Sequence, residues 1–231
     1  MRSFIHALLW TMRHLQGRYK VEEVGFLRQY VKPTDITIDV GAHSGSWSVP
    51  LSRIVTAGEV IGYEALPYYA STLVKTLRLL GRNNVQVRNK AVSDKPGQLE
   101  LVWQSSSGAA LTGYTHLVGI DEKATGTIQV QAVSLDDEFK SEQRRIGFIK
   151  CDVEGAELSV FKGAAALIRK HKPVIYTEIN ETWCQRYGHH AETVFTLLAT
   201  YGYNAHTLSK QGEIIPQLQP ASGDFLFLPF N

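Results

Sequence analysis

An acid followed within two residues by a glycine turn is the part of this chain best suited to chemistry. Residues 36–47 read ITIDVGAHSGSW. The alternating apolar residues of 36–40 predict a strand, and the apolar residues after the turn predict a helix. Gly41 and Gly45 bracket the turn between them. A strand that passes through glycines into a helix presents backbone N–H groups to a ligand at the carboxyl edge of a sheet.

The charge before this turn separates two classes of cofactor. Asp39 lies two residues before Gly41, where a carboxylate would repel a pyrophosphate and attract a cation. The turn also lacks the middle glycine of the dinucleotide-binding pattern. We therefore expect S-adenosylmethionine, with Asp39 orienting its amino group, Gly41 and Gly45 admitting its methionine part, and His43 lining the pocket. An ordinary βα turn with a surface histidine is the alternative.

Two later segments complete the predicted cofactor site. Glu64 ends a second apolar run about twenty residues past the turn, where a carboxylate can accept both ribose hydroxyls of an adenosine. A solvated acid at a strand end is its alternative. Ser93 and Asp94 follow the third predicted strand, where the adenine edge would lie. For these two residues an ordinary turn is an equally good interpretation.

Two more carboxylates terminate consecutive strands further along. Asp152 and Glu178 each end a buried run, so both should face the same crevice at the carboxyl edge of the sheet. Lys150 shares Asp152's side of the strand, where it either pairs with that carboxylate or contacts substrate. Glu154 and Glu157 open the next helix, and acids in that place are also favoured by the helix dipole.

The strands and helices that must position these residues alternate along the chain. This alternation predicts an α/β fold with a mostly parallel sheet covered by helices on both faces. Predicted helices are 68–80, 157–170 and 191–201, and predicted strands are 85–87, 203–208 and 224–228, with 98–103 and 127–133 as an antiparallel pair. No repeat or linker interrupts the pattern, so we expect one domain over residues 1–231.

Composition narrows the class of protein. The chain has 231 residues, 44% of them apolar, and a net charge of +2 without a basic stripe. A core of this size suits a single enzyme domain, and the charge pattern does not predict a nucleic-acid partner. Cys151 and Cys184 lack metal-type spacing, which favours a reduced, cytoplasmic protein. Nothing in the sequence decides between a monomer and a homodimer.

Two segments outside the predicted sheet have separate interpretations. The first residues are apolar for too short a run to span a bilayer. Apolar positions at helical spacing, from Ile5 to Leu15, predict an amphipathic helix within 1–30 that packs on the domain, with peripheral membrane contact as the alternative. Residues 104–126 are rich in Ser, Gly and Thr, which indicates a substrate-side loop.

Short segments in a fixed order make the chain resemble the FkbM-type S-adenosylmethionine-dependent methyltransferases. They are DVGAHSG (39–45), YEALP (63–67), AVSD (91–94), SLDD (134–137), IKCDVEGAE (149–157), FKGA (161–164) and PVIYTE (173–178). The resemblance implies a Rossmann-like class I methyltransferase fold with a seven-stranded sheet and an antiparallel final strand. It also implies methyl transfer to a hydroxyl of a sugar, glycan or natural product. Cys151 departs from the family pattern and is interpreted as a packing residue.

Methyl transfer to an alcohol needs a route for the hydroxyl proton. Asp152 can accept that proton, with Glu178 and Lys150 beside it as further catalytic candidates. A divalent ion would lower the acceptor's pKa, and Asp152, Glu178 and Asn180 are hard oxygen ligands suited to Mg²⁺. The alternatives from other classes are a non-catalytic S-adenosylmethionine- or nucleotide-binding module and, less favoured by the glycine spacing, a nicotinamide-dependent oxidoreductase.

Overall fold

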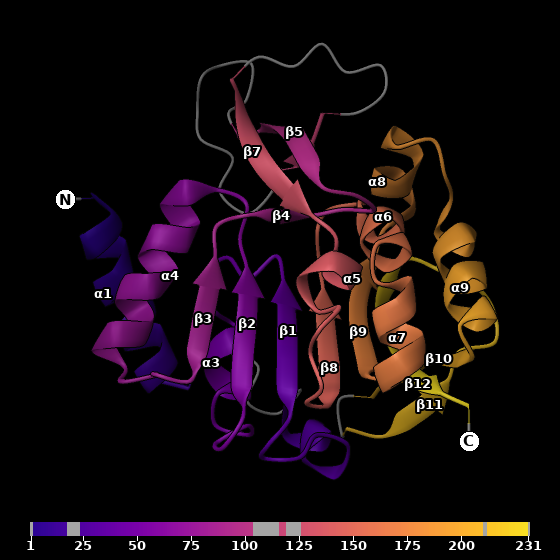
Figure 1. The fold of residues 1–231 in the computed structure, drawn as a ribbon, viewed down its shortest axis with the longest axis horizontal. Coiled ribbons are helices and arrows are strands. Elements are labelled where there is room, and N and C mark those ends of the chain that lie inside the picture. The colour runs from indigo at the N-terminus through magenta and orange to yellow at the C-terminus, as the bar shows by residue number, and fades with distance from the viewer. Residues whose placement is uncertain (1, 18–23, 104–115, 119–125, 210–211, 231) are drawn as a thin grey trace.

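The computed structural model describes residues 2–17, 24–103, 116–118, 126–209 and 212–230. Within them a large mixed sheet of eight strands forms the centre of the molecule (Figure 1). Its order across the sheet is β11 (Ile214–Pro216), β10 (Tyr203–Leu208), β12 (Gly223–Pro229), β9 (Val174–Ile179), β8 (Ile146–Cys151), β1 (Ile36–Val40), β2 (Glu59–Tyr63) and β3 (Val85–Arg88).

Strand direction confirms the predicted class of fold. The five neighbours from β9 to β3 are parallel, whereas β12 runs antiparallel between β9 and β10. This is the Rossmann-like arrangement with an antiparallel final strand. The eighth strand, β11, was not predicted and pairs with β10 at the edge of the sheet. It is three residues long and ends in Pro216, which suits an edge strand and gives little periodic signal.

Helices cover both faces of this sheet. In Figure 1 α5, α6 and α7 lie in front of the strands and α3 lies behind them. The described helices are α1 (Arg2–Leu15), η1 (Phe26–Gln29), α3 (Ser48–Leu51), α4 (Pro67–Leu79), α5 (Leu135–Glu138), α6 (Glu157–Lys162), α7 (Ala165–His171), α8 (Glu181–Arg186) and α9 (Ala191–Thr200). Among these helices none is long and apolar enough to cross a membrane.

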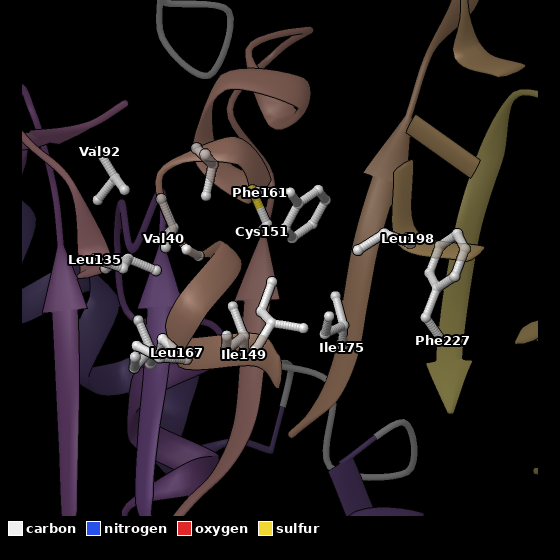
Figure 2. Packing of buried hydrophobic residues seen from close by; sticks show 14 of the residues in the cluster. Val40, Val92, Leu135, Ile149, Cys151, Phe161, Leu167, Ile175, Leu198 and Phe227 are labelled. Atoms are coloured by element: carbon white, nitrogen blue, oxygen red, sulfur yellow. The ribbon is translucent and has the colours of Figure 1, made fainter. Parts of the chain in front are cut away.

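The two faces bury separate hydrophobic clusters because side chains alternate along each strand. One cluster joins Phe161 of α6 and Leu198 of α9 to strand residues such as Ile149 and Ile175, and Figure 2 shows these side chains meeting. The other joins η1 and α3 to the opposite face. Cys151 is fully buried in the first cluster, as predicted for a packing residue, and burial raises the pKa of its thiol well above the ordinary value.

The helix predicted over 157–170 is in fact two helices, α6 and α7. At the break, Gly163 packs directly on the backbone of Ser93, so that a Cβ at Gly163 would overlap the backbone oxygen of Ser93. The carboxylate of Asp136 then accepts hydrogen bonds from the backbone N–H groups of Ala166 (3.0 Å) and Leu167 (2.8 Å). Those bonds satisfy donors at the start of α7. The sequence did not predict this break because the apolar residues keep their helical spacing across it.

A small second sheet lies beyond the carboxyl edge of the large one (Figure 1). Its order is β4 (Ala91–Val92), β7 (Thr127–Val133), β5 (Gly97–Val102) and β6 (His116–Leu117). The pairing of β5 with β7 is antiparallel, which confirms the predicted pair. Most of the predicted loop 104–126 lies outside the described residues, so its place on the substrate side stays a prediction.

The first helix packs on the domain, but through a different face from the predicted one. The helix packs against α4 and buries Ala7 and Thr11, while His14 is buried against Ser44 of the glycine turn. The apolar stripe from Ile5 to Leu15 was expected to face the domain, and this was wrong because its large side chains are exposed. At this contact Thr76 Oγ1 of α4 donates to the backbone oxygen of Ala7 at 3.5 Å, an approach that the small Ala7 side chain allows.

Candidate active site

A cavity of about 270 Å³ opens at the carboxyl edge of the large sheet. Its walls come from the ends of β1, β2 and β8, from the turns that follow them, and from β4 and β5 of the small sheet. This is the position at which α/β folds of this topology bind ligands. The sequence-predicted residues on these walls are Gly41, His43, Glu64, Lys150 and Asp152.

Gly41 is required by the geometry of the turn. Its φ is +76°, and a Cβ there would overlap the backbone oxygen of Asp152. Its N–H donates to the carbonyl of Tyr63 at 3.0 Å, which ties the end of β1 to the end of β2. Gly45, with φ of +84°, faces away from the cavity, and a Cβ there would meet Leu73 of α4 at 2.6 Å. Gly41 thus allows a close backbone approach on the cavity side of the turn, and Gly45 allows one on the side of α4.

Gly41→Ala is expected to destabilise the protein and weaken cofactor binding together. Gly81→Ala is the matched control, because Gly81 also has positive φ (+65°) but has open space around the Cβ position. Both changes incur the cost of positive φ, about 1 kcal/mol, whereas only Gly41→Ala adds about 1–3 kcal/mol of steric overlap. Thermal unfolding should show a lower Tm for Gly41→Ala than for Gly81→Ala. Equal Tm values would contradict the close approach at Gly41.

Glu64 is buried on the cavity wall and organises the turns on either side. Its carboxylate accepts hydrogen bonds from the backbone N–H of His43 and of Leu66, each at 2.8 Å. Burial raises the pKa of Glu64 to about 7, although these two hydrogen bonds oppose the rise. The predicted strand-end acid is therefore not a solvated one, and its contact with a ribose stays a prediction.

His43 lines the cavity and is half-buried. Its backbone has φ of +44°, and its ring centroid is 4.1 Å from that of Tyr69. Burial, together with the charge of Lys150, lowers the pKa of His43 to about 4. The imidazole is therefore neutral near pH 7, so it can shape the cavity and hydrogen-bond a ligand without adding charge.

Lys150 connects two acids at the base of the cavity. Its Nζ lies 3.4 Å from Asp152 Oδ2 and 3.6 Å from Asp39 Oδ1, and it donates to the backbone oxygen of Gly41 at 2.9 Å. Burial by itself would lower the pKa of Lys150, but the two carboxylates raise it above its ordinary value. The side chain therefore stays cationic and fixes the end of β1 against the end of β8.

The two acids paired with Lys150 differ in exposure. Asp39 is fully buried beneath the wall, and its Oδ2 accepts a hydrogen bond from Ser48 Oγ at 2.6 Å. The carboxylate predicted to orient the cofactor's amino group thus contacts Lys150 rather than the open cavity. Asp152 is on the wall, and 38% of its side chain is exposed. It is the member of this group that a ligand in the cavity can reach.

The turn after Asp152 contributes an acid that was not predicted to lie in the site. Glu154 lines the cavity and has φ of +53°. The carboxylate of Glu157 accepts hydrogen bonds from the N–H groups of Val153 (3.0 Å) and Gly155 (3.2 Å), which holds this turn in place. Burial, followed by the charges of Asp152 and Glu178, raises the pKa of Glu154 to about 7. Glu154 was interpreted as an acid that opens the next helix. The glycine that follows it was overlooked, and a Glu-Gly pair is typical of a tight turn.

Several predicted site residues are not brought onto the cavity wall. Glu178 is exposed at the end of β9, and Asn180 caps α8 by accepting a hydrogen bond from Trp183 N at 3.3 Å. Within the described part of the chain, no three His, Cys, Asp or Glu side chains form a group that could hold a metal ion. The Mg²⁺ hypothesis thus receives no support from these residues.

The predicted adenine-side residues also lie off the wall. Ser93 is buried behind it, where its hydroxyl donates to Asp94 Oδ1 at 3.2 Å and its backbone meets Gly163. The preceding residues, 90–92, line the cavity in their place. The end of β3 was located correctly. Because β4 begins only two residues after β3, however, the residues that reach the cavity come earlier in the chain than Ser93.

A family model described as a methyltransferase FkbM domain matches residues 39–205. The chain belongs to the FkbM methyltransferase family. It is also 24% identical over 189 residues to Methyltransferase 1 of Beauveria bassiana (strain ARSEF 2860), covering 72% of this chain and 71% of that protein. The family assignment favours a methyltransferase over the nicotinamide-dependent oxidoreductase and implies S-adenosylmethionine as cofactor.

Solved structures agree with the fold of this FkbM-family chain. Methyltransferase FkbM from Methylobacillus flagellatus KT superposes with a TM-score of 0.53 at 17% identity and covers 86% of this chain. This chain spans only 44% of the length of that structure's chain. A Streptococcus mutans protein solved in complex with SAH has a TM-score of 0.50 at 12% identity, over 89% of this chain and 93% of that chain.

Proposed function

We propose that this FkbM-family methyltransferase transfers the methyl group of S-adenosylmethionine to a hydroxyl of a sugar, glycan or natural-product acceptor. The observation that carries the proposal is the exposed carboxylate of Asp152, which Lys150 holds on the cavity wall at 3.4 Å. An exposed, oriented carboxylate at this place can bind the acceptor hydroxyl and receive its proton.

The other walls suit the methyl donor. Glu64 is at the end of β2, where it would accept the ribose hydroxyls, and Gly41 lets the backbone approach the methionine part.

Proton removal is assigned to the two acids of the turn after β8. Asp152 faces the cavity directly, and Glu154 lies on the same wall with a pKa of about 7. A carboxylate with that pKa takes up a proton more readily near neutral pH than one of ordinary acidity. Lys150 positions Asp152 and remains cationic, so it is a positioning residue here rather than the base.

The class of acceptor is inferred from chemistry and charge. The net charge of +2 without a basic stripe supports a small-molecule or carbohydrate acceptor rather than nucleic acid. Cys151 and Cys184 are both free and buried, which is compatible with a reducing, cytoplasmic setting for the reaction. Trp183 and its neighbours in 182–190 touch the turn at Gly155 and would form the acceptor side of the site.

An acceptor screen tests the proposal. The protein is incubated with S-adenosylmethionine and hydroxylated metabolites, sugars and glycans, each paired with its deoxy analogue, and products are detected by mass. We expect a gain of one methyl group on a hydroxylated acceptor and none on its deoxy partner. Equal methylation of the two partners, or methylation confined to RNA, would contradict the proposed acceptor class.

The pH dependence of turnover tests the part assigned to Glu154. A base must be ionised to accept a proton, so kcat at saturating S-adenosylmethionine should rise as pH increases through about 7, the pKa of Glu154. Glu154→Gln should lower kcat and flatten this rise. If the variant keeps the same rise with pH, the ionisation belongs to another group and Glu154 only shapes the turn.

A further inference from the structure

The outward face of α1 exposes large apolar side chains over its whole length. Between 42% and 72% of each residue is accessible, and the six residues are Phe4, Ile5, Leu8, Leu9, Met12 and Leu15. Their spacing of three and four places them on one side of the helix. The opposite side, with Ala7, Thr11 and His14, is the one buried against α4 and the glycine turn. The face is therefore continuous and lies away from the core of the domain.

Within the described residues, the charged side chains of α1 and α4 have one sign. Neither α1 nor α4 contains an Asp or Glu, and no acid occurs between Glu64 and Asp94. Arg13 lies in the last turn of α1 with its guanidinium over the Trp10 ring, and Lys75 of α4 donates to Ser3 Oγ of α1 at 2.6 Å. Cationic groups thus flank the apolar side chains, and the helix pair brings no carboxylate to balance them.

We propose that α1 binds in the plane of an anionic lipid surface, with its apolar face in the acyl boundary and its cationic flank on the headgroups. An apolar stripe beside basic residues is the arrangement that interfacial helices use. Fourteen residues span only about 21 Å at 1.5 Å per residue, so the helix can lie in the interface but cannot cross a bilayer core of about 30 Å.

Two other partners fit the same surface less well. A second copy of the chain would bury the apolar face, but it would also bring together cationic groups of the same sign around it. RNA would match the charge, but it offers no apolar counterpart for a row of aliphatic side chains from Leu8 to Leu15. An anionic lipid surface is complementary to both properties at once.

The lipid-binding helix is in contact with the cavity. The Trp10 ring lies 5.8 Å from the His43 ring, and His14 Nε2 donates to the backbone oxygen of Ser44 at 3.3 Å. Tyr68 at the start of α4, beside the wall residue Tyr69, hydrogen-bonds His6 at 2.7 Å. Docking through α1 therefore brings the glycine turn close to the lipid surface. Membrane binding is independent of the proposed acceptor, since none of the six apolar residues lines the cavity.

Vesicle co-sedimentation tests this proposal. The full chain is mixed with vesicles of phosphatidylcholine alone or with added phosphatidylglycerol, at low and high salt. We expect binding to the anionic vesicles, less binding at high salt, and little on the neutral ones. The double change Leu8→Gln and Met12→Gln should weaken binding by about tenfold or more, because two apolar side chains no longer enter the acyl boundary.

The matched control replaces two exposed apolar residues elsewhere. Ile215→Gln with Leu218→Gln, at sites 47% and 87% exposed, should leave vesicle binding unchanged. Circular dichroism and Tm should show both double variants folded, and S-adenosylmethionine affinity should be retained. No sedimentation of the wild type with anionic vesicles would overturn the proposal. So would a dimer in light scattering that the Leu8/Met12 variant dissociates, or RNA binding that the same variant abolishes.

Discussion

Asp152→Asn is expected to lower turnover by on the order of a hundredfold or more while S-adenosylmethionine binds with near-normal affinity. Asparagine keeps the size of the side chain on the cavity wall but removes the charge that can receive a proton. The rest of the cluster should stay in place, since Lys150 keeps Asp39 at 3.6 Å and the backbone oxygen of Gly41 at 2.9 Å. The loss should therefore appear in kcat rather than in folding or cofactor binding.

Steady-state kinetics on an acceptor from the screen, with Tm and calorimetric affinity for S-adenosylmethionine measured alongside, provide the test. Glu192→Gln removes a negative charge from an exposed position on α9 and should behave like wild type. If Asp152→Asn turns over like wild type, the carboxylate is structural and catalysis rests on positioning. Glu178→Gln compares the two strand-end acids. Because Glu178 is exposed and lies off the cavity wall, its loss should lower kcat far less than the loss of Asp152 does.

Glu64→Ala should weaken S-adenosylmethionine binding by about 1.5–3 kcal/mol, which corresponds to a Kd raised roughly ten- to 150-fold. The change removes the predicted ribose acceptor and also frees the N–H groups of His43 and Leu66. Glutamine would be an imperfect replacement, since its NH₂ group would face one of those backbone donors. Titration calorimetry gives the affinity, and thermal unfolding gives the cost to the turns.

Glu157→Ala separates these two effects. Glu157 is also a buried acid with a pKa raised by burial to about 7, and it also accepts two backbone N–H groups, but it does not line the cavity. Its loss should lower Tm about as much as Glu64→Ala does and reduce S-adenosylmethionine affinity less. Equal losses of affinity in the two variants would remove Glu64 from the ribose role and attribute its effect to a loosened turn.

The fold could be predicted from periodic patterns because burial on two faces leaves a clear signal. Strands such as β10 and β12 and the helix α4 lie close to the residues expected. The break between α6 and α7 could not be predicted, since it depends on a contact between Gly163 and Ser93, which are distant in sequence. The exposed side of α1 was missed for a related reason. Apolar periodicity identifies a face, but it does not state what that face meets.

The candidate site shows the same limit. Strand ends located Glu64, Lys150 and Asp152 on the cavity wall, because parallel strands bring their carboxyl ends to one edge. The sequence could not show that Asp39 would be covered by Ser48 and Lys150, because both contacts are made by side chains from other elements. Nor could it show that Glu154 would line the cavity, since a single turn with positive φ decides its direction.

Identification of the methylated atom tests the central claim most directly. S-adenosylmethionine carrying a carbon-13 methyl group is turned over with an acceptor, and the product is examined by carbon-13 NMR. The account predicts that the label appears as a methoxy group on the acceptor and that Asp152→Asn slows its appearance. A label on nitrogen or carbon, or one that stays on the donor with every hydroxylated acceptor supplied, would contradict O-methyl transfer at this cavity.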